Sequence, residues 1–315
     1  MPFIAEGVIP ATLVAFHQDY EIDVEASRKH LRDVAAVDGL NAITVNGHAS
    51  EIHAFTLNEQ QRLLAESLEE VGDSLPLVNG VYADGSHAAV AVAKMSTTEG
   101  ASALLVFPPN SMSMGGQLCP EMAINHFSMI ASATDLPLIL FQYPASTGLG
   151  YPFETLLRIF EAVPSVVAIK DWCNDPMLPE RHIRTFQSLP RRVNVLSTHS
   201  SWLMASLSMA PAGLLSGAGS VIADLQVELF NAMQRNDLAS ARTINDRIYP
   251  LAQAFYRAPF LDMHNRMKEC LVLLGRLEEA VVRPPLQKLE ETEISFLEEA
   301  LVDAGLLGEA RRRFG

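Results

Sequence analysis

The sequence predicts an α/β fold, a closed (β/α)8 TIM barrel that ends in a C-terminal helical appendage. Short apolar runs alternate about eight times with longer amphipathic stretches, within about 230 residues. Strands that are apolar along their whole length and separated by helices form parallel sheets. Eight such units in this length favour a closed barrel over an open doubly wound sheet. No Gly-x-Gly-x-x-Gly motif follows the first run, which weakens the dinucleotide-binding alternative.

Each expected strand is followed by a helical pattern. In the segment 58–71, for example, Leu63, Leu64, Leu68 and Val71 recur every three to four residues and mark one buried helix face. The expected strands are 8–16, 40–46, 75–81, 102–109, 136–143, 166–171, 192–198 and 212–218.

No strand signal follows Asp237. The segments 237–255, 260–274 and 290–304 have helical patterns, and the run 282–286, which contains two prolines, breaks the last two apart. We therefore expect a barrel over residues 1–236 and a helical extension over 237–315 that packs on the barrel rather than folding independently.

Composition narrows the choice of partners and compartment. The formal charge of −14 argues against a nucleic-acid or anionic-membrane partner, which would need a basic face. No apolar run reaches about 18 residues, so no membrane span or export signal is expected. Three cysteines, odd in number and far apart, indicate a reducing, cytoplasmic location.

Lys170 is the strongest catalytic candidate, because it ends an apolar strand and lysine is rarely buried. Alternation places Val166, Ala168 and Lys170 on one face. If that face points inward, the amine emerges at the C-terminal mouth, where barrel enzymes have their active sites. Desolvation would lower its pKa and free a neutral amine to attack a ketone. The alternative is a strand-end ion pair with Asp171.

Two further places carry polar or aromatic candidates. The loop 46–53 after the second strand contains Gly47, whose backbone allows close approach, and exposed amides there suit a carboxylate. The spacing of His48, Glu51 and His53 matches no tight metal motif. Tyr143 after the fifth strand either reaches the mouth or plugs the barrel. The remaining candidate, after the seventh strand, is His199.

The ordered set of short motifs resembles the family of dihydrodipicolinate synthase and N-acetylneuraminate lyase, over nearly the whole chain. No single motif decides this, but their order is specific. The matching segments are 9–16, 22–23, the loop 47–51 (a diverged G-T-T-G-E), 80–81, 100–101, 108–109, 144–148, 168–171, Ser197, 213–216 and 283–286.

The resemblance implies a cofactor-free Schiff-base mechanism in which Lys170 condenses with pyruvate or another 2-oxo acid. The loop around Gly47, His48 and Ala49, with the backbone near Leu215, would hold the carboxylate. The resemblance also implies a homo-oligomer, a tetramer or a dimer. It requires no metal.

The sequence departs from the family's synthases where they relay protons through a threonine and two tyrosines. His48 takes the place of the threonine, and Asn110 and Ser111 stand where a tyrosine pair is usual. Phe141 aligns with the catalytic tyrosine and cannot carry a proton. His48 or Tyr143 is expected to replace it, since unperturbed histidine titrates near about 6.5. A carboxylate-binding arginine is replaced by Ser146.

These departures predict an aldolase or dehydratase acting on a 2-oxo acid, not a true dihydrodipicolinate synthase. Phe141, Ser111 and Ser146 favour a less anionic substrate, sugar-derived or aromatic, and Phe141, Ser111 and His199 are expected to contact it. Two alternatives remain at this point. One is a non-catalytic barrel that senses a 2-oxo acid, and the other is a metal-dependent lyase that uses His48 and His199.

Overall fold

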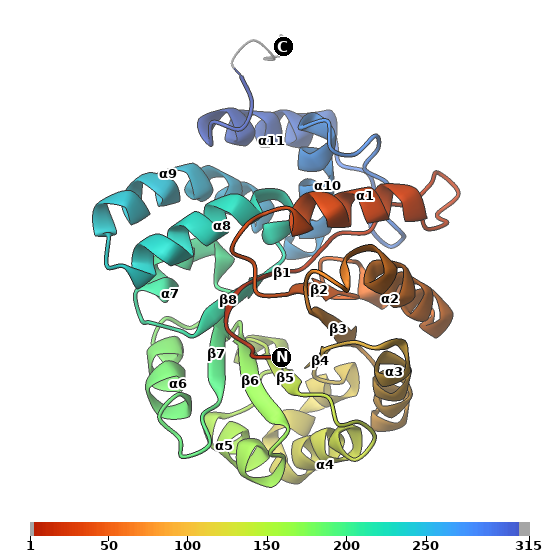
Figure 1. Ribbon diagram of the computed structural model, residues 1–315, viewed down its shortest axis with the longest axis vertical. Coiled ribbons are helices and arrows are strands. Elements are labelled where there is room, and N and C mark those ends of the chain that lie inside the picture. Colours follow the sequence, from red (N-terminus) through yellow and green to blue (C-terminus); the bar gives the residue numbers. More distant parts are fainter. Residues whose placement is uncertain (1–2, 309–315) are drawn as a thin grey trace.

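Eight parallel strands form a ring in the computed structural model, which describes residues 3–308 (Figure 1). The strands pair in the order β1-β8-β7-β6-β5-β4-β3-β2, and parallel bridges from Val8 to Leu40 and from Ala11 to Thr44 close the ring. The expected barrel is confirmed. Its strands are β1 Gly7–Pro10, β2 Ile43–Val45, β3 Leu77–Val81, β4 Ala103–Val106, β5 Leu138–Gln142, β6 Val166–Asp171, β7 Asn194–Ser197 and β8 Gly213–Ser216.

The first strand is shorter than the apolar run 8–16 that predicts it. β1 ends at Pro10, and the chain continues through buried Leu13, Val14 and Phe16 before Phe16 bridges Ile22. A buried connecting segment needs apolar side chains as much as a strand does, so hydrophobicity alone does not separate the two.

Helices surround the ring and pack their apolar faces against it. In α2, Thr56 and Glu59 form a capping box, and Leu63, Leu64 and Val71 are buried as their spacing predicts. The helices of the barrel units are α1 Val24–Ala35, α2 Leu57–Val71, α3 Ser86–Glu99, α4 Pro120–Ala131, α5 Phe153–Ala162, α6 Leu178–Phe186, α7 Leu203–Leu207 and α8 Gly219–Gln234.

Three helices follow the barrel and lie together beyond α8 (Figure 1). They are α9 Leu238–Phe255, α10 Met263–Leu273 and α11 Glu291–Asp303. The side chain of Asp237 caps α9 by accepting a hydrogen bond from the Ser240 N–H. Leu297 and Leu301 of α11 are fully buried in the same core as the barrel interior. Residues 309–315 of the expected extension lie outside the described residues.

A buried ion pair ties this extension to the loop after β2. Lys268 Nζ of α10 donates to Glu51 Oε1 at 2.5 Å and to the Val281 carbonyl at 2.7 Å. The Arg283 N–H donates to the other carboxylate oxygen at 3.0 Å. Breaking a buried pair by removing one partner costs several kcal/mol, roughly 3–5. The extension therefore helps to fix the loop that carries His48.

Between residues 3 and 308, every helix is too short or too polar to cross a bilayer.

Candidate active site

Lys170 lies at the C-terminal end of β6, beside Phe141 of β5. Its side chain is only 4% exposed, and Nζ is 4.0 Å from the centre of the Phe141 ring. Among residues 3–308, nothing forms a hydrogen bond or ion pair with this amine. Burial without a counter-ion lowers the pKa of Lys170 to about 7. At neutral pH a large share of the amine is therefore uncharged and nucleophilic.

The alternative ion pair between Lys170 and Asp171 does not form. Asp171 Oδ2 instead accepts a hydrogen bond from His182 Nδ1 of α6 at 2.7 Å, and Oδ1 accepts one from the Cys173 N–H at 3.0 Å. Successive residues of a strand point to opposite faces. The Lys170 amine is thus on the inner face of the barrel without an acidic partner. The Asp171 carboxylate is on the opposite face, where His182 and Cys173 bind it.

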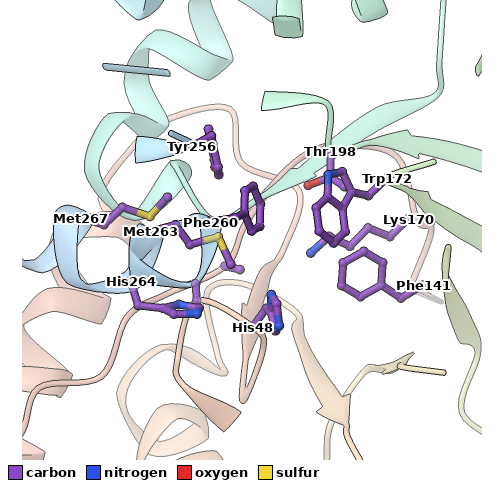
Figure 2. A pocket seen from close by; sticks show the side chains of 13 residues that line it. His48, Phe141, Lys170, Trp172, Thr198, Tyr256, Phe260, Met263, His264 and Met267 are labelled. Atoms are coloured by element: carbon purple, nitrogen blue, oxygen red, sulfur yellow. The ribbon is translucent and has the colours of Figure 1, made fainter. Parts of the chain in front are cut away.

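A narrow cavity that is partly open to solvent surrounds the end of Lys170. Figure 2 shows the amine pointing toward the space between Phe260 and His48. The strands and loops of the barrel line one side with Ala11, His48, Ala49, Phe141, Lys170, Trp172, Thr198 and Gly217. The C-terminal extension lines the other with Tyr256, Phe260, Met263, His264 and Met267.

The loop after β2 presents free backbone donors at this cavity. The Gly47 N–H donates to Ser50 Oγ at 3.3 Å, whereas the N–H groups of His48 and Ala49 have no partner in the described part of the chain. Ser50 holds the loop by donating to the Thr12 carbonyl at 2.7 Å. Two adjacent free N–H groups form a concavity suited to a carboxylate.

His48 sits within a group of aromatic rings. Its ring centre is 6.0 Å from that of Phe107, 6.2 Å from that of Tyr143 and 5.5 Å from that of His264. Burial and the nearby charge of Lys170 lower the pKa of His48 to about 3. His48 is therefore a neutral imidazole in the free protein, which differs from the value near 6.5 expected for a loop histidine.

Tyr143 lies behind the cavity wall, 7% exposed, with its ring centre 4.6 Å from that of Phe141 and 5.3 Å from that of Trp172. Burial, with a smaller effect of Tyr82, raises the pKa of its hydroxyl. This environment resembles the aromatic plug more than an exposed acid. Phe141 itself is on the cavity wall.

Three expected substrate contacts lie elsewhere. Ser111 is exposed and donates to the Asp84 carbonyl at 2.7 Å. His199 stacks on Trp202 with ring centres 4.3 Å apart, and its Nε2 is 3.9 Å from Cys173 Sγ. Leu215 is fully buried within β8, and Gly217 replaces it at the cavity.

Several cavity residues have no counterpart among the expected ones. Trp172 follows Lys170 by two positions, and Thr198 follows the inward Leu196 by two, so alternation along the strands points to both. The five residues of the extension, His264 among them, give no such signal, because only packing of the chain brings them opposite Lys170.

Metal-ligating side chains gather at a different place from the cavity. Among the described residues, only Asp171, Cys173 and His182 bring three such groups together, with their ligand atoms within 4.8 Å of one another. All three are buried, and existing hydrogen bonds already satisfy the carboxylate. His48 and His199, on which the metal-dependent alternative relied, are not members of this group.

The model of the dihydrodipicolinate synthetase family matches residues 4–304, which is nearly the whole chain. The chain belongs to this family. An uncharacterized DapA-like lyase of Halobacterium salinarum is 28% identical over 308 residues, covering 97% of this chain and 96% of the relative. A 4-hydroxy-tetrahydrodipicolinate synthase of Methanopyrus kandleri is 26% identical over 310 residues, which cover 98% of this chain and 99% of the relative.

Solved structures of the family share the fold. The Escherichia coli K12 prophage protein YagE, in complex with pyruvate, has a TM-score of 0.87 at 21% identity and covers 96% of this chain and all of its own. A dihydrodipicolinate synthase variant described as the first monomeric one has a TM-score of 0.86 at 24% identity. The match covers 96% of this chain and 97% of that variant.

Proposed function

We propose that this family member is a Schiff-base lyase that acts on pyruvate or another 2-oxo acid through Lys170. The observation that carries the proposal is a buried amine without a counter-ion, whose pKa is lowered to about 7, at the mouth of the barrel. A lysine activated by desolvation is a typical imine-forming nucleophile. The test is reductive trapping of the imine with pyruvate and borohydride.

The reaction begins when Nζ adds to the keto carbon and the keto oxygen leaves as water. The resulting iminium accepts electrons. In an aldol cleavage, the C3–C4 bond breaks, its electron pair forms an enamine, and the C4 hydroxyl loses its proton to become an aldehyde. In a dehydration, C3 loses a proton and the β-hydroxyl departs as water. Hydrolysis of the final iminium restores the amine.

The substrate carboxylate fits the free N–H groups of His48 and Ala49. Hydrogen bonds to an ionised acceptor are roughly twice as strong as neutral ones, and the loop is already fixed by Ser50 and by the Glu51–Lys268 pair. A carboxylate held there brings the ketone of a 2-oxo acid to the amine, since keto and carboxyl carbons are bonded.

His48 is our candidate for the group that moves the proton. Its pKa is low in the free protein because burial and the charge of Lys170 oppose protonation. A bound carboxylate supplies a negative charge that offsets the cation and raises this pKa toward its ordinary range. Phe141 has no exchangeable proton, and the raised pKa of Tyr143 keeps that hydroxyl protonated and makes it a poor proton donor.

We expect His48→Ala to keep imine trapping at Lys170 but to lose turnover by at least about tenfold, because general acid–base assistance contributes roughly 10²–10⁴-fold. Tyr143→Phe is expected to be milder. Single-turnover trapping and steady-state kinetics on the same preparations separate the two steps. Near-normal turnover in His48→Ala, together with an inactive Tyr143→Phe, would assign the proton to the tyrosine.

We also propose that the protein is a homo-oligomer. Three apolar side chains are strongly exposed after β4, Met114 at 89%, Leu118 at 72% and Met122 at 56%. They lie on consecutive short segments that contact one another. Clustered exposed apolar side chains mark interaction surfaces.

In sedimentation at micromolar concentration, the wild type is expected to behave as a dimer or tetramer. Leu118→Glu should shift it to a smaller species, because a buried charge without a partner opposes association. Leu238→Glu is the matched control, a leucine exposed elsewhere, at the start of α9, and should sediment like wild type. A monomeric wild type would refute the proposal.

A further inference from the structure

His264 is a buried histidine whose hydrogen bonds are incomplete. Its side chain is 0% exposed, and neither Nδ1 nor Nε2 makes a well-directed hydrogen bond within the part of the chain that the structure describes. The Ala49 backbone lies close enough to accept from one ring nitrogen, which leaves the other without a partner among these residues. A neutral imidazole has one donor and one acceptor. Leaving a buried polar atom unpaired costs about 1–3 kcal/mol. Ring contacts and the Ala49 backbone therefore account for only part of this environment, and a bound molecule would supply the missing partner.

The His264 imidazole belongs to the wall of the cavity. His264 is the second residue of α10, and Figure 2 places it beside His48, across the cavity from Lys170. The ring centres of His264 and His48 are 5.5 Å apart in an edge-to-face arrangement. A molecule joined to Lys170 and extending away from it would therefore approach both imidazoles.

The rest of that wall limits the chemistry of what it binds. Phe260, Met263 and Met267 are apolar, and among residues 3–308 no acid, arginine or second lysine lines the cavity. A charged group bound there would lose its hydration without gaining a counter-charge. A hydroxyl would satisfy an imidazole nitrogen and leave its carbon atoms on the methionine and phenylalanine surfaces.

We propose that His264 is the specificity-determining residue for the distal part of the substrate, and that it selects 2-oxo acids with an uncharged tail that bears a hydroxyl group. The inference rests on the proposed imine chemistry at Lys170 and adds to it. The C-terminal extension then contributes directly to substrate choice, while the barrel provides the amine and the carboxylate site.

The test compares pairs of 2-oxo acids that differ by one hydroxyl, 2-oxobutanoate against 4-hydroxy-2-oxobutanoate, and 2-oxopentanoate against its 4-hydroxy and 5-hydroxy derivatives. Each is trapped on the protein with borohydride over a range of concentrations, and the adduct is quantified by mass spectrometry. Cleavage of a 4-hydroxy acid would leave pyruvate on the lysine, so adducts of the intact acid and of pyruvate, which differ in mass, are counted together. Pyruvate, which has no tail, measures imine formation alone.

In the wild type, at least one hydroxylated acid should half-saturate trapping at about a tenfold lower concentration than its partner, which corresponds to one hydrogen bond of about 1.4 kcal/mol. In His264→Leu this ratio should fall to within about twofold of one, with the pyruvate value unchanged. His264→Gln keeps a donor and an acceptor and should retain part of the preference. His30→Leu, which changes a buried histidine in α1, should behave like wild type.

The outcomes are distinct. Absence of any preference in wild-type protein overturns the inference without recourse to a variant, and leaves water as the partner of His264. A preference that survives in His264→Leu also overturns it. Failure of the wild type to trap pyruvate at all would instead refute the proposed function.

Discussion

Borohydride reduction in the presence of pyruvate is expected to attach one reduced pyruvate to the peptide that contains Lys170. Lys170→Ala should show neither the adduct nor measurable turnover, because Lys170 supplies the one amine that the described residues bring to the cavity. Lys94→Ala, which removes an exposed lysine of α3, should trap and react like wild type. The measurement is peptide mass spectrometry after digestion, repeated with several 2-oxo acids.

The pH dependence of trapping is the second part of this expected result. Burial lowers the pKa of Lys170 from 10.5 to about 7, so the neutral amine predominates above pH 7 and is lost as the pH falls through it. The trapping rate should therefore fall about tenfold for each pH unit below 7 and level off above about 8. An ordinary lysine would still gain rate up to about pH 10.

Two results would contradict the assignment. One is a wild type that traps none of the acids, and the other is an adduct that persists unchanged in Lys170→Ala. If imine forms but no candidate substrate turns over, the barrel is a 2-oxo-acid sensor rather than a lyase. Turnover is thus the measurement that separates these two functions.

The sequence was informative about Lys170 because two simple rules apply there. A strand alternates its faces, and a barrel of parallel strands brings their carboxyl ends to one mouth. The same rules extend to Trp172 and Thr198, which line the cavity. They hold for one residue beyond the ends of β6 and β7 and fail at the next residue after β7. His199 begins a turn with φ −78° and ψ 59°, so its side chain no longer follows the alternation of β7.

The contribution of the extension could not be read from local patterns. The segment that contains Met263, His264 and Met267 has only the spacing of a buried helix, and nothing in that spacing says which cavity the helix faces. The low pKa of His48 had the same origin, since it depends on burial and on a lysine far along the chain. The residue type thus predicted which groups could move a proton, whereas tertiary packing set the pKa of His48 and decided which residues line the cavity.

We expect negligible condensation of pyruvate with aspartate semialdehyde, the reaction that relays its proton through tyrosines in the family's synthases. Phe141 stands on the cavity wall where the synthases have a hydroxyl, and Ser111 is outside the cavity. Loss of acid–base assistance typically costs about 10²–10⁴-fold in rate.

The charge of the cavity acts in the same direction. An aldehyde that carries a carboxylate would meet Phe260, Met263 and two neutral histidines, with no cation other than Lys170 to balance it. Ser146, in the place of the family's arginine, is exposed in the turn after β5 and supplies no charge. Desolvation of that carboxylate therefore weakens its binding. This loss adds to the slower chemistry that follows from the missing acid–base group.

A coupled assay for the condensation product measures this rate, and trapping of pyruvate on the same preparation shows that the first step is intact. With trapping intact, we expect a rate at least about 10²-fold below the typical enzyme turnover of about 10 s⁻¹. A turnover within tenfold of that value would mean that another group replaces the missing hydroxyl. Because His48 is a neutral imidazole on the cavity wall and the charge of Lys170 acts on it, His48→Ala would then be the variant expected to abolish it.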